Sequence, residues 1–183
     1  MKPRVHDPLR LAVEAFAKEG GRLEGRWPLA GFERLAESAH AEARPGAADE
    51  VAWTVSGEAR PVRGGAPELW LHVSAAASVN LECQRCLQPV ATPLAVQRSF
   101  RFAPDEATAA EIDADSEDDV LVLTRALDLH ELVEDELILA LPLVPRHEVC
   151  PQPLAAPAAT DEPPAERPNP FAALAAPKRG EPH

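Results

Sequence analysis

The sequence predicts an α+β protein: a curved antiparallel sheet of about five strands, packed helices and a disordered C-terminal tail. Residues 69–81 alternate apolar and polar side chains over thirteen positions, which is the pattern of a half-buried strand. Residues 129–141 place their apolar side chains at helical spacing instead. From residue 151 onward proline and alanine dominate without any periodicity, as in disordered segments. We expect the helices to lie near residues 8–18, 30–43 and 128–141.

The N-terminal part of the chain predicts a helix, a strand and a second helix. Asp7 is a suitable cap for a helix that starts at Pro8, and Gly20 is a suitable end for it. The stretch "RLEGRWPL" (22–29) then alternates as a strand does. In residues 30–43 the apolar positions return to helical spacing.

The middle of the chain predicts strands, an acidic loop and the best-defined helix. Strand patterns cover residues 51–59, 69–81, 92–102 and 120–124. Between the last two, the acidic loop 104–119 carries eight acidic residues and no basic one, so we expect it to be solvated. Asp128 and Glu131 form a capping-box start for the helix that Pro142 ends. Its acidic face is expected to lie in solvent: Glu131, Glu134, Asp135 and Glu136.

Charge and hydropathy exclude several classes of protein. The net charge of −12 argues against nonspecific binding of nucleic acid over the whole surface. Residues 84–103 nevertheless carry three arginines and no acidic residue, which predicts a small basic face for RNA or a partner protein. No stretch has the roughly 20 apolar residues of a membrane span, and no apolar signal segment follows Met1, so we expect a cytoplasmic protein without membrane contact. The arginines are Arg85, Arg98 and Arg101.

The three cysteines suggest a metal site. Cys83 and Cys86 form a C-x₂-C pair, and His147 and Cys150 provide a second pair with the same spacing. Three thiolates and one imidazole are a common ligand set for tetrahedral structural zinc. Such a site would close a loop of about 60 residues and leave no open coordination position. We therefore predict one structural Zn²⁺ at these four residues.

Two other interpretations of the cysteines stay open. Cys83 and Cys86 could form a thiol–disulfide redox pair, although no helix follows them to lower a thiol pKa through its dipole. Alternatively, the thiols are buried without a metal. We predict no catalytic residues. No histidine, His72 included, has a sequence spacing to serine or aspartate that is typical of a catalytic motif, and no nucleotide-binding glycine pattern occurs. We accordingly expect no small-molecule substrate.

The domain boundary is predicted near residue 150. Residues 1–150 would form the α+β domain, and 151–183 the Pro/Ala-rich tail. The stretch "NPFAAL" (169–174) near the end of this tail contains Phe171 and Leu174, an apolar pair in a polar context. We expect these two side chains either to dock onto the domain or to bind a partner.

Three segments together resemble the bacterial YceD family: "LECQRCLQPV", "DLHELVEDELILALPLVPRHEVC" and the terminal "NPFAAL". The resemblance covers residues 7–150 and 169–174. It implies a cytoplasmic, non-enzymatic ribosome-biogenesis factor that supports synthesis, processing or stability of large-subunit (23S) rRNA, with that rRNA or ribosomal proteins as partners. Some members of the family carry a second cysteine pair where this chain has His147 and Cys150. The alternatives are a cytoplasmic thiol–disulfide oxidoreductase and an adaptor with a structural zinc knuckle.

Overall fold

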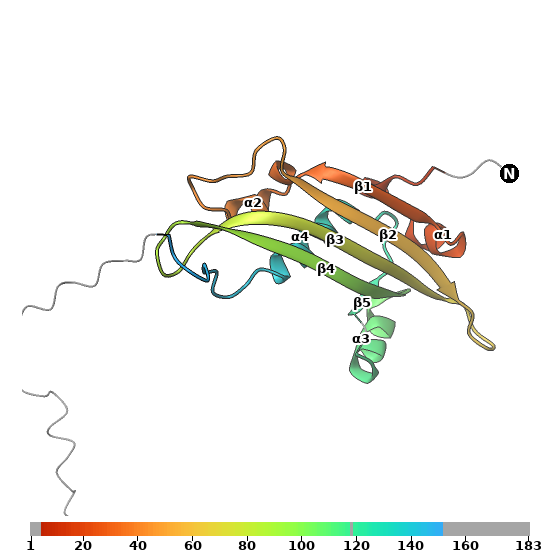
Figure 1. Cartoon of the computed structure of the whole chain (residues 1–183). Helices are drawn as coiled ribbons and strands as arrows, with labels where there is room; N and C mark the ends of the chain where they lie inside the picture. Colours follow the sequence, from red (N-terminus) through yellow and green to blue (C-terminus); the bar gives the residue numbers. More distant parts are fainter. Residues whose placement is uncertain (1–4, 118, 152–183) are drawn as a thin grey trace, which may run out of the picture. The chain divides into compact units, whose positions relative to one another are not determined.

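A five-stranded mixed sheet in the order β1-β2-β3-β4-β5 forms the centre of the molecule, as the computed structural model shows for residues 5–117 and 119–151 (Figure 1). The first four strands pair antiparallel with their neighbours in sequence. The expected number of strands is confirmed. The strands are β1 (Arg22–Pro28), β2 (Glu50–Arg60), β3 (Glu68–Glu82), β4 (Pro89–Ala103) and β5 (Asp119–Val122).

The last strand corrects the expectation of a purely antiparallel sheet. β5 runs parallel to β4, with Phe100 opposite Asp119 and Ala103 opposite Val122. Parallel neighbours need a connection that carries the chain back along the sheet, and this connection usually contains a helix. The segment between Ala103 and Asp119 supplies that helix.

The prediction of an acidic loop at 104–119 is therefore wrong for most of its length. Helix α3 spans Glu106–Asp115, and the Asp105 side chain caps it by accepting a 2.9 Å hydrogen bond from the Thr108 N–H. Acidic residues in a first turn are stabilised by the helix dipole. Alanine is the strongest helix former, and of the alanines here only Ala109 is buried. A helix that buries so few side chains has no apolar stripe, so hydrophobic periodicity does not reveal it.

The two N-terminal helices are shorter than predicted. Pro8–Arg10 form one 3₁₀ turn, and helix α1 spans only Val13–Lys18. The break lies at Leu11, whose backbone pairs with Leu127 through hydrogen bonds of 2.8 and 2.9 Å. Long-range pairing of this kind leaves no trace in the local sequence.

In place of the second predicted helix, a 3₁₀ turn at Leu29–Gly31 precedes helix α2, which spans only Glu33–Glu37. The chain then leaves the helix, and the backbone N–H of His40 bonds to the carbonyl of Asn80 on β3.

Helix α4 (Leu129–Leu139) confirms the predicted helix at 128–141. The Asp128 side chain accepts hydrogen bonds from the backbone N–H groups of His130 and Glu131. Its apolar stripe is fully buried against the sheet and α2, and together with Phe16, Phe32 and the inward residues of β2 and β3 it forms the core. The stripe consists of Leu129, Val133 and Leu137.

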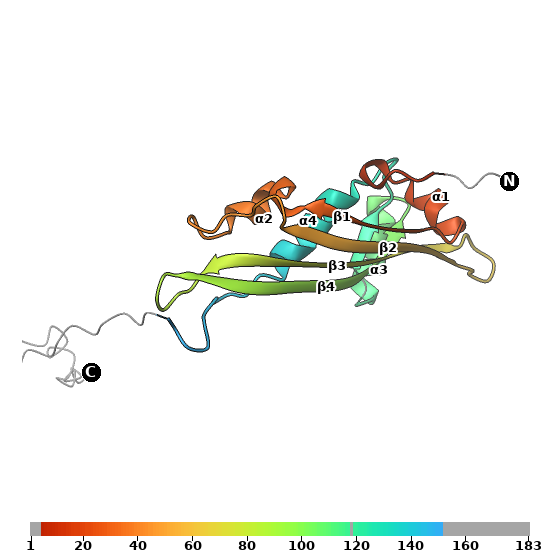
Figure 2. The same ribbon diagram turned by 45° about the horizontal axis from the view of Figure 1, so that its top comes forward.

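The helices lie on both faces of the sheet (Figures 1 and 2). α1, α2 and α4 cover the core face, and α1 comes so close that a Cβ at Gly57 would lie 2.8 Å from the Cα of Ala17. α3 packs near the opposite face, where Arg101 lines a small cavity with Ile112 of α3. Among the residues that the structure describes, no helix is long and apolar enough to cross a membrane.

The acidic face of α4 is not wholly solvated as expected. Glu134 is only 7% exposed and accepts hydrogen bonds from the backbone N–H groups of Arg34 and Leu35 and from the Arg34 guanidinium. Glu136 is 8% exposed and accepts from Arg98 at 3.1 Å. Desolvation raises the pKa of Glu136, while the neighbouring Arg98 opposes this rise. Two of the four acids are thus buried because arginines from α2 and β4 reach them.

Candidate metal centre

A tight turn between β3 and β4, residues 83–88 and here called the knuckle, holds the first two cysteines. The Leu87 N–H donates to the carbonyl of Cys83 at 2.8 Å, and the Cys83 N–H donates to the carbonyl of Gln88 at 3.0 Å. Leu87 has a φ of +60°, which closes the turn. This local geometry brings the side chains of Cys83 and Cys86 into the same small space.

The segment after α4 runs beside the knuckle (Figure 1). The Gln84 N–H donates to the carbonyl of Pro145 at 2.9 Å. The Arg85 guanidinium donates to the carbonyl of His147 and, at 3.1 Å, to that of Glu148. These backbone contacts place His147 and Cys150 opposite the two knuckle cysteines.

The four predicted ligands do come together. We call Cys83, Cys86, His147 and Cys150 the cysteine–histidine cluster; their ligand atoms all lie within 4.8 Å of one another. The sulfur atoms of Cys83 and Cys150 are 3.9 Å apart, and the sulfur of Cys86 is 3.5 Å from Nδ1 of His147. Ligands on a tetrahedral zinc, with bonds of about 2.0–2.3 Å, lie about 3.5–3.8 Å from each other. The arrangement and its donor set therefore fit a metal ion.

The ring of His147 is oriented by a second contact. Its Nε2 lies 3.1 Å from the carbonyl of Pro89, so Nε2–H donates there and Nδ1 keeps its lone pair for the side of the cysteines. Histidine ligands in metal sites commonly donate their second ring N–H to a carbonyl in this way. The imidazole is thus in the tautomer that a metal needs.

The thiols differ in acidity. Burial raises the pKa of Cys83, but hydrogen bonds from the backbone N–H groups of Arg85, His147 and Cys86 outweigh it and lower this pKa to about 5. Burial and the neighbouring thiols of Cys86 and Cys83 raise the pKa of Cys150. Without a metal the cluster therefore holds a thiolate at Cys83 at neutral pH. The negative charge of this thiolate attracts a cation.

A lowered thiol pKa is equally a requirement of thiol redox chemistry. The two uses differ in the access that they need. Cys83 is fully buried and Cys86 is 5% exposed, whereas a thiol that attacks a protein disulfide has to reach it. The burial of both sulfur atoms favours the metal.

One residue of the site was missed by the sequence analysis. His40 is 9% exposed, and its Nε2 donates to the carbonyl of Leu87 at 3.0 Å, while its Nδ1 accepts from the Glu42 N–H. It thereby holds the knuckle at the residue with positive φ. No spacing in the sequence relates His40 to the cysteines, because the contact depends on how the loop after α2 packs against β3.

The three predicted contact arginines do not lie on one face. Arg85 is on the knuckle, while Arg98 and Arg101 are on β4 with side chains on opposite faces of the sheet. Arg98 pairs with Glu136 and Asp119, and Arg101 pairs with Glu68 at 2.8 Å. The predicted tail residues Phe171 and Leu174 lie outside the described residues.

A hydrogen-bonded row that sequence spacing did not indicate crosses the sheet on the face opposite the core. Nδ1 of His72 lies 2.8 Å from the Ser99 hydroxyl, and Nε2 lies 2.9 Å from a carboxylate oxygen of Glu58. The three residues come from β4, β3 and β2, and the strand register brings them together. Sequence distances of 14 and 27 residues carry no such signal.

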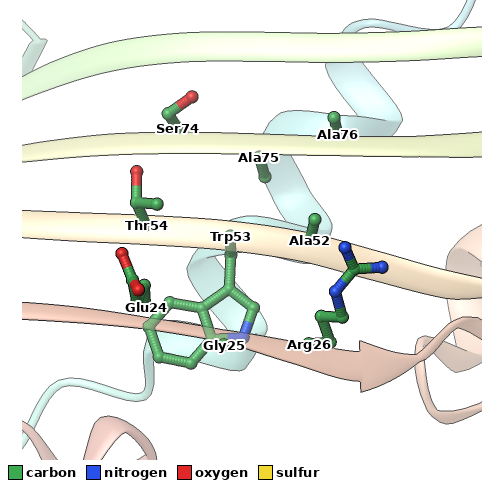
Figure 3. Close-up of a pocket in the computed structure, with 9 residues that line it drawn as sticks. All are labelled: Glu24, Gly25, Arg26, Ala52, Trp53, Thr54, Ser74, Ala75 and Ala76. Carbon is green, nitrogen blue, oxygen red and sulfur yellow. The ribbon is translucent and has the colours of Figure 1, made fainter.

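A shallow cavity of about 580 Å³ lies over β1, β2 and β3 (Figure 3). Its charged side chains are Glu24 and Arg26, and its hydroxyl groups belong to Thr54 and Ser74. It contains neither cysteine nor histidine. It is thus separate from the cysteine–histidine cluster.

Comparison with known proteins finds relatives over the part of the chain that contains the cluster. The sequence model of the family described as "Large ribosomal RNA subunit accumulation protein YceD" matches residues 71–177, a range that contains the whole cluster. A curated relative from Haemophilus influenzae (strain ATCC 51907 / DSM 11121 / KW20 / Rd), named "Large ribosomal RNA subunit accumulation protein YceD", is 37% identical over 110 residues. The match covers 53% of this chain and spans only 58% of the relative's length. No solved structure matches.

The family model covers more than half of the chain. The resemblance noted from the knuckle, from helix α4 with the segment after it, and from the terminal motif is thereby confirmed. This chain belongs to the YceD family of large ribosomal RNA subunit accumulation proteins.

Proposed function

We propose that this protein is a non-enzymatic ribosome-biogenesis factor that acts in the cytoplasm by binding, and that it supports synthesis, processing or stability of 23S rRNA. The observation that carries the proposal is the family match over residues 71–177, which includes every residue of the cysteine–histidine cluster. The relative from Haemophilus influenzae is itself named for accumulation of the large ribosomal RNA subunit. Large-subunit rRNA and ribosomal proteins are the proposed partners.

We further propose that Cys83, Cys86, His147 and Cys150 hold one structural Zn²⁺. Zinc supplies bonds that join the knuckle to the segment after α4. The residues themselves prepare the site: the Cys83 thiolate attracts the ion, and the Pro89 carbonyl orients His147. With four protein ligands the site has no open position for a substrate, so its role is to fix the shape of this end of the molecule.

Sedimentation of the tagged, full-length chain from cell lysate through a sucrose gradient tests the function. We expect comigration with large-subunit particles or their precursors at low salt, and weaker comigration at moderate salt if charges hold the contact. Depletion of the protein should lower 23S rRNA relative to 16S rRNA. A chain that stays at the top of the gradient at both salt concentrations, with unchanged 23S rRNA after depletion, contradicts the proposal.

The metal is tested on the same material. Purification without added metal, followed by elemental analysis, should give about one zinc per chain, and Cys86→Ser should remove it. A wild-type protein free of zinc that also fails to take up Zn²⁺ or Co²⁺ contradicts the proposed site.

A thiol–disulfide oxidoreductase is the second candidate, and the specific observation in its favour is the pKa of about 5 at Cys83. This function requires the metal-free chain to reduce insulin disulfides in the presence of a thiol donor, with loss of activity in Cys83→Ser. Absence of turnover in both the metal-free and the zinc-loaded protein removes this candidate.

A further inference from the structure

We infer that Arg85 and Arg146 form a phosphate-binding site, assembled by the cysteine–histidine cluster, through which the chain contacts the backbone of RNA. The assignment of RNA as the source of the phosphate rests on the proposed function. The site itself rests on the geometry of the two arginines.

Both arginines line one cavity beside the cluster. This cavity has a volume of about 350 Å³, and its other lining residues are His147 and Glu148. Arg85 comes from the knuckle, whereas Arg146 directly precedes a ligand in the segment after α4. Two arginines from distant parts of the chain thus line the same space.

Arg85 is held in place without being neutralised. Its Nη2 donates to two backbone carbonyls, those of His147 and Glu148, and within the described part of the chain it forms no ion pair with a carboxylate. The other guanidinium nitrogens keep their donors. A fixed guanidinium loses less conformational entropy when it binds a ligand than a mobile one does.

Arg146 is exposed and makes neither a hydrogen bond nor an ion pair with any residue that the structure describes. Glu148 also lines the cavity, and among the described residues its carboxylate forms no ion pair with either arginine. The two arginines of β4 differ in this respect, because Arg98 and Arg101 are bound to Glu136 and Glu68. Among the described residues, the two arginines of this cavity are therefore without a bonded carboxylate.

Phosphate is the ligand that this pair suits. A guanidinium presents two parallel N–H donors that match two oxygens of a phosphate, and a second guanidinium can take the remaining oxygens. No carboxylate of the described residues is bonded to these donors. A repeating backbone of phosphates, as in RNA, would place successive groups within reach of the exposed cavity.

The overall charge of −12 does not prevent this contact. Helix α3, which carries four acidic residues, lies near the opposite end of β4 from the knuckle (Figures 1 and 2). β4 has 15 residues and is therefore about 50 Å long, whereas charges are screened over about 8 Å at physiological ionic strength. Repulsion from α3 is thus weak at the knuckle.

The cluster couples the phosphate site to the metal. Arg85 lies between Cys83 and Cys86, and Arg146 precedes His147, so the bonds that join the ligands also join the arginines. Removal of the metal should loosen the second segment from the knuckle and separate the two guanidinium groups. Binding of phosphate and binding of zinc should therefore depend on each other.

The test measures fluorescence anisotropy of labelled single-stranded RNA with the zinc-loaded, full-length chain. The variant Arg85→Gln/Arg146→Gln, called the knuckle variant below, loses both charges of the cavity beside the cluster. The control Arg22→Gln/Arg63→Gln loses two exposed charges on β1 and on the β2–β3 connection. Neither control arginine forms an ion pair within the described residues. Zinc content and thermal unfolding are measured for both, so that a folding defect is recognised.

We expect the knuckle variant to bind at least tenfold more weakly than wild type and the control to bind within twofold of it. The slope of log affinity against log salt should fall by about 0.7, since the two arginines neutralise one phosphate and each phosphate contact on a single strand contributes about 0.7. Chelation of zinc should weaken binding by wild type but change the knuckle variant little. Inorganic phosphate should compete only at millimolar concentration.

Several results overturn the inference. Equal losses in the two double variants mean that the charge of the whole surface is responsible. Inorganic phosphate that binds as tightly as RNA identifies a small-anion site. Comigration with large-subunit particles that persists in the knuckle variant, with no RNA binding by any form, identifies a protein partner and leaves the proposed function standing.

Discussion

At the scale of single residues, the acidity of Cys83 comes from backbone groups rather than from a charged neighbour. Three N–H groups surround its sulfur, two from the knuckle and one from the segment after α4. They lower its pKa to about 5 in a site that is otherwise apolar enough to raise it. The charge state of this side chain therefore reports whether the two segments are in contact.

The first prediction concerns the pH dependence of stability in the metal-free chain. The pKa of Cys83 falls from about 8.5 in the unfolded chain to about 5 in the folded one, so its ionisation stabilises the fold fully above pH 8.5. This contribution should disappear as the pH falls from about 8.5 to 5. Urea unfolding at several pH values measures it. Cys83→Ser should lack this part of the pH dependence, and an identical profile in the variant would refute the assignment.

The second prediction concerns His40, which we regard as a positioning residue for the knuckle. Its removal leaves the carbonyl of Leu87 without the imidazole donor, and outer contacts of this kind change metal affinity by about 10-fold or more. His40→Ala should lower zinc affinity in a chelator competition by about tenfold and should alter the d–d spectrum of the Co²⁺ form. His72→Ala, which changes a histidine on the sheet, serves as the control. Equal affinities in the two variants would mean that His40 does not position the site.

The third prediction concerns the row formed by Ser99, His72 and Glu58. Its order of hydrogen bonds matches that of a nucleophile, a base and an acid, but a binding factor has no need of such chemistry. We expect no labelling of the chain by a fluorophosphonate probe and unchanged 23S rRNA levels with Ser99→Ala. Labelling that disappears in this variant would show a reactive serine and contradict the non-enzymatic proposal.

At the scale of elements, α2 and α4 are joined through one buried carboxylate. Glu134 receives the N-terminal N–H groups of α2 as well as the Arg34 side chain. α2 is only five residues long and could not persist alone in water. The carboxylate thus substitutes for the cap that the sequence of α2 lacks.

The fourth prediction follows from this contact. Glu134→Ala leaves two backbone donors without their acceptor and leaves the Arg34 guanidinium with Asp135 alone, which should lower the free energy of unfolding by about 2 kcal/mol. Glu131→Ala, an exposed substitution on the same helix, should change it by no more than about 0.5 kcal/mol. Urea unfolding of both variants decides the matter. A similar small effect in both would show that Glu134 does not hold α2.

The elements differ in how well the sequence predicts them. β2, β3 and β4 are long and alternate over most of their length, because each buries one face under helices, and they were predicted almost to their ends. α3 was missed, since alanines and acids form a helix without a buried stripe. The N-terminal helices were predicted to be longer than they are. The hydrogen bonds that interrupt them, at Leu11 and His40, are made to distant strands and loops.

At the scale of the whole molecule, the core and the cysteine–histidine cluster lie in different places. The buried apolar residues are gathered between the sheet and α1, α2 and α4, whereas the cluster lies past the ends of β3 and β4. The core should therefore remain folded when the knuckle and the segment after α4 are not joined by a metal. A bound metal would therefore stabilise the local structure at the knuckle rather than the fold as a whole.

The fifth prediction states this for the zinc-loaded protein treated with a chelator. Far-UV circular dichroism should change little, while hydrogen exchange should accelerate in residues 83–88 and 143–151. These segments depend on the bonds from Gln84 and Arg85 to the chain after α4. Exchange in β2 and β3 provides the internal control. Global unfolding on chelation would show that the cluster carries the fold as well.

The sequence by itself determined the strand pattern, helix α4 and the four candidate ligands with their spacing. These depend on periodicity and on residue type, which are local properties of the chain. Only the tertiary structure decided that the ligands meet within 4.8 Å, that β5 runs parallel, and that Arg98 and Arg101 are paired while Arg85 and Arg146 share a cavity. Such facts arise from contacts between residues far apart in the chain, and local patterns contain no information about which distant segments will pack together.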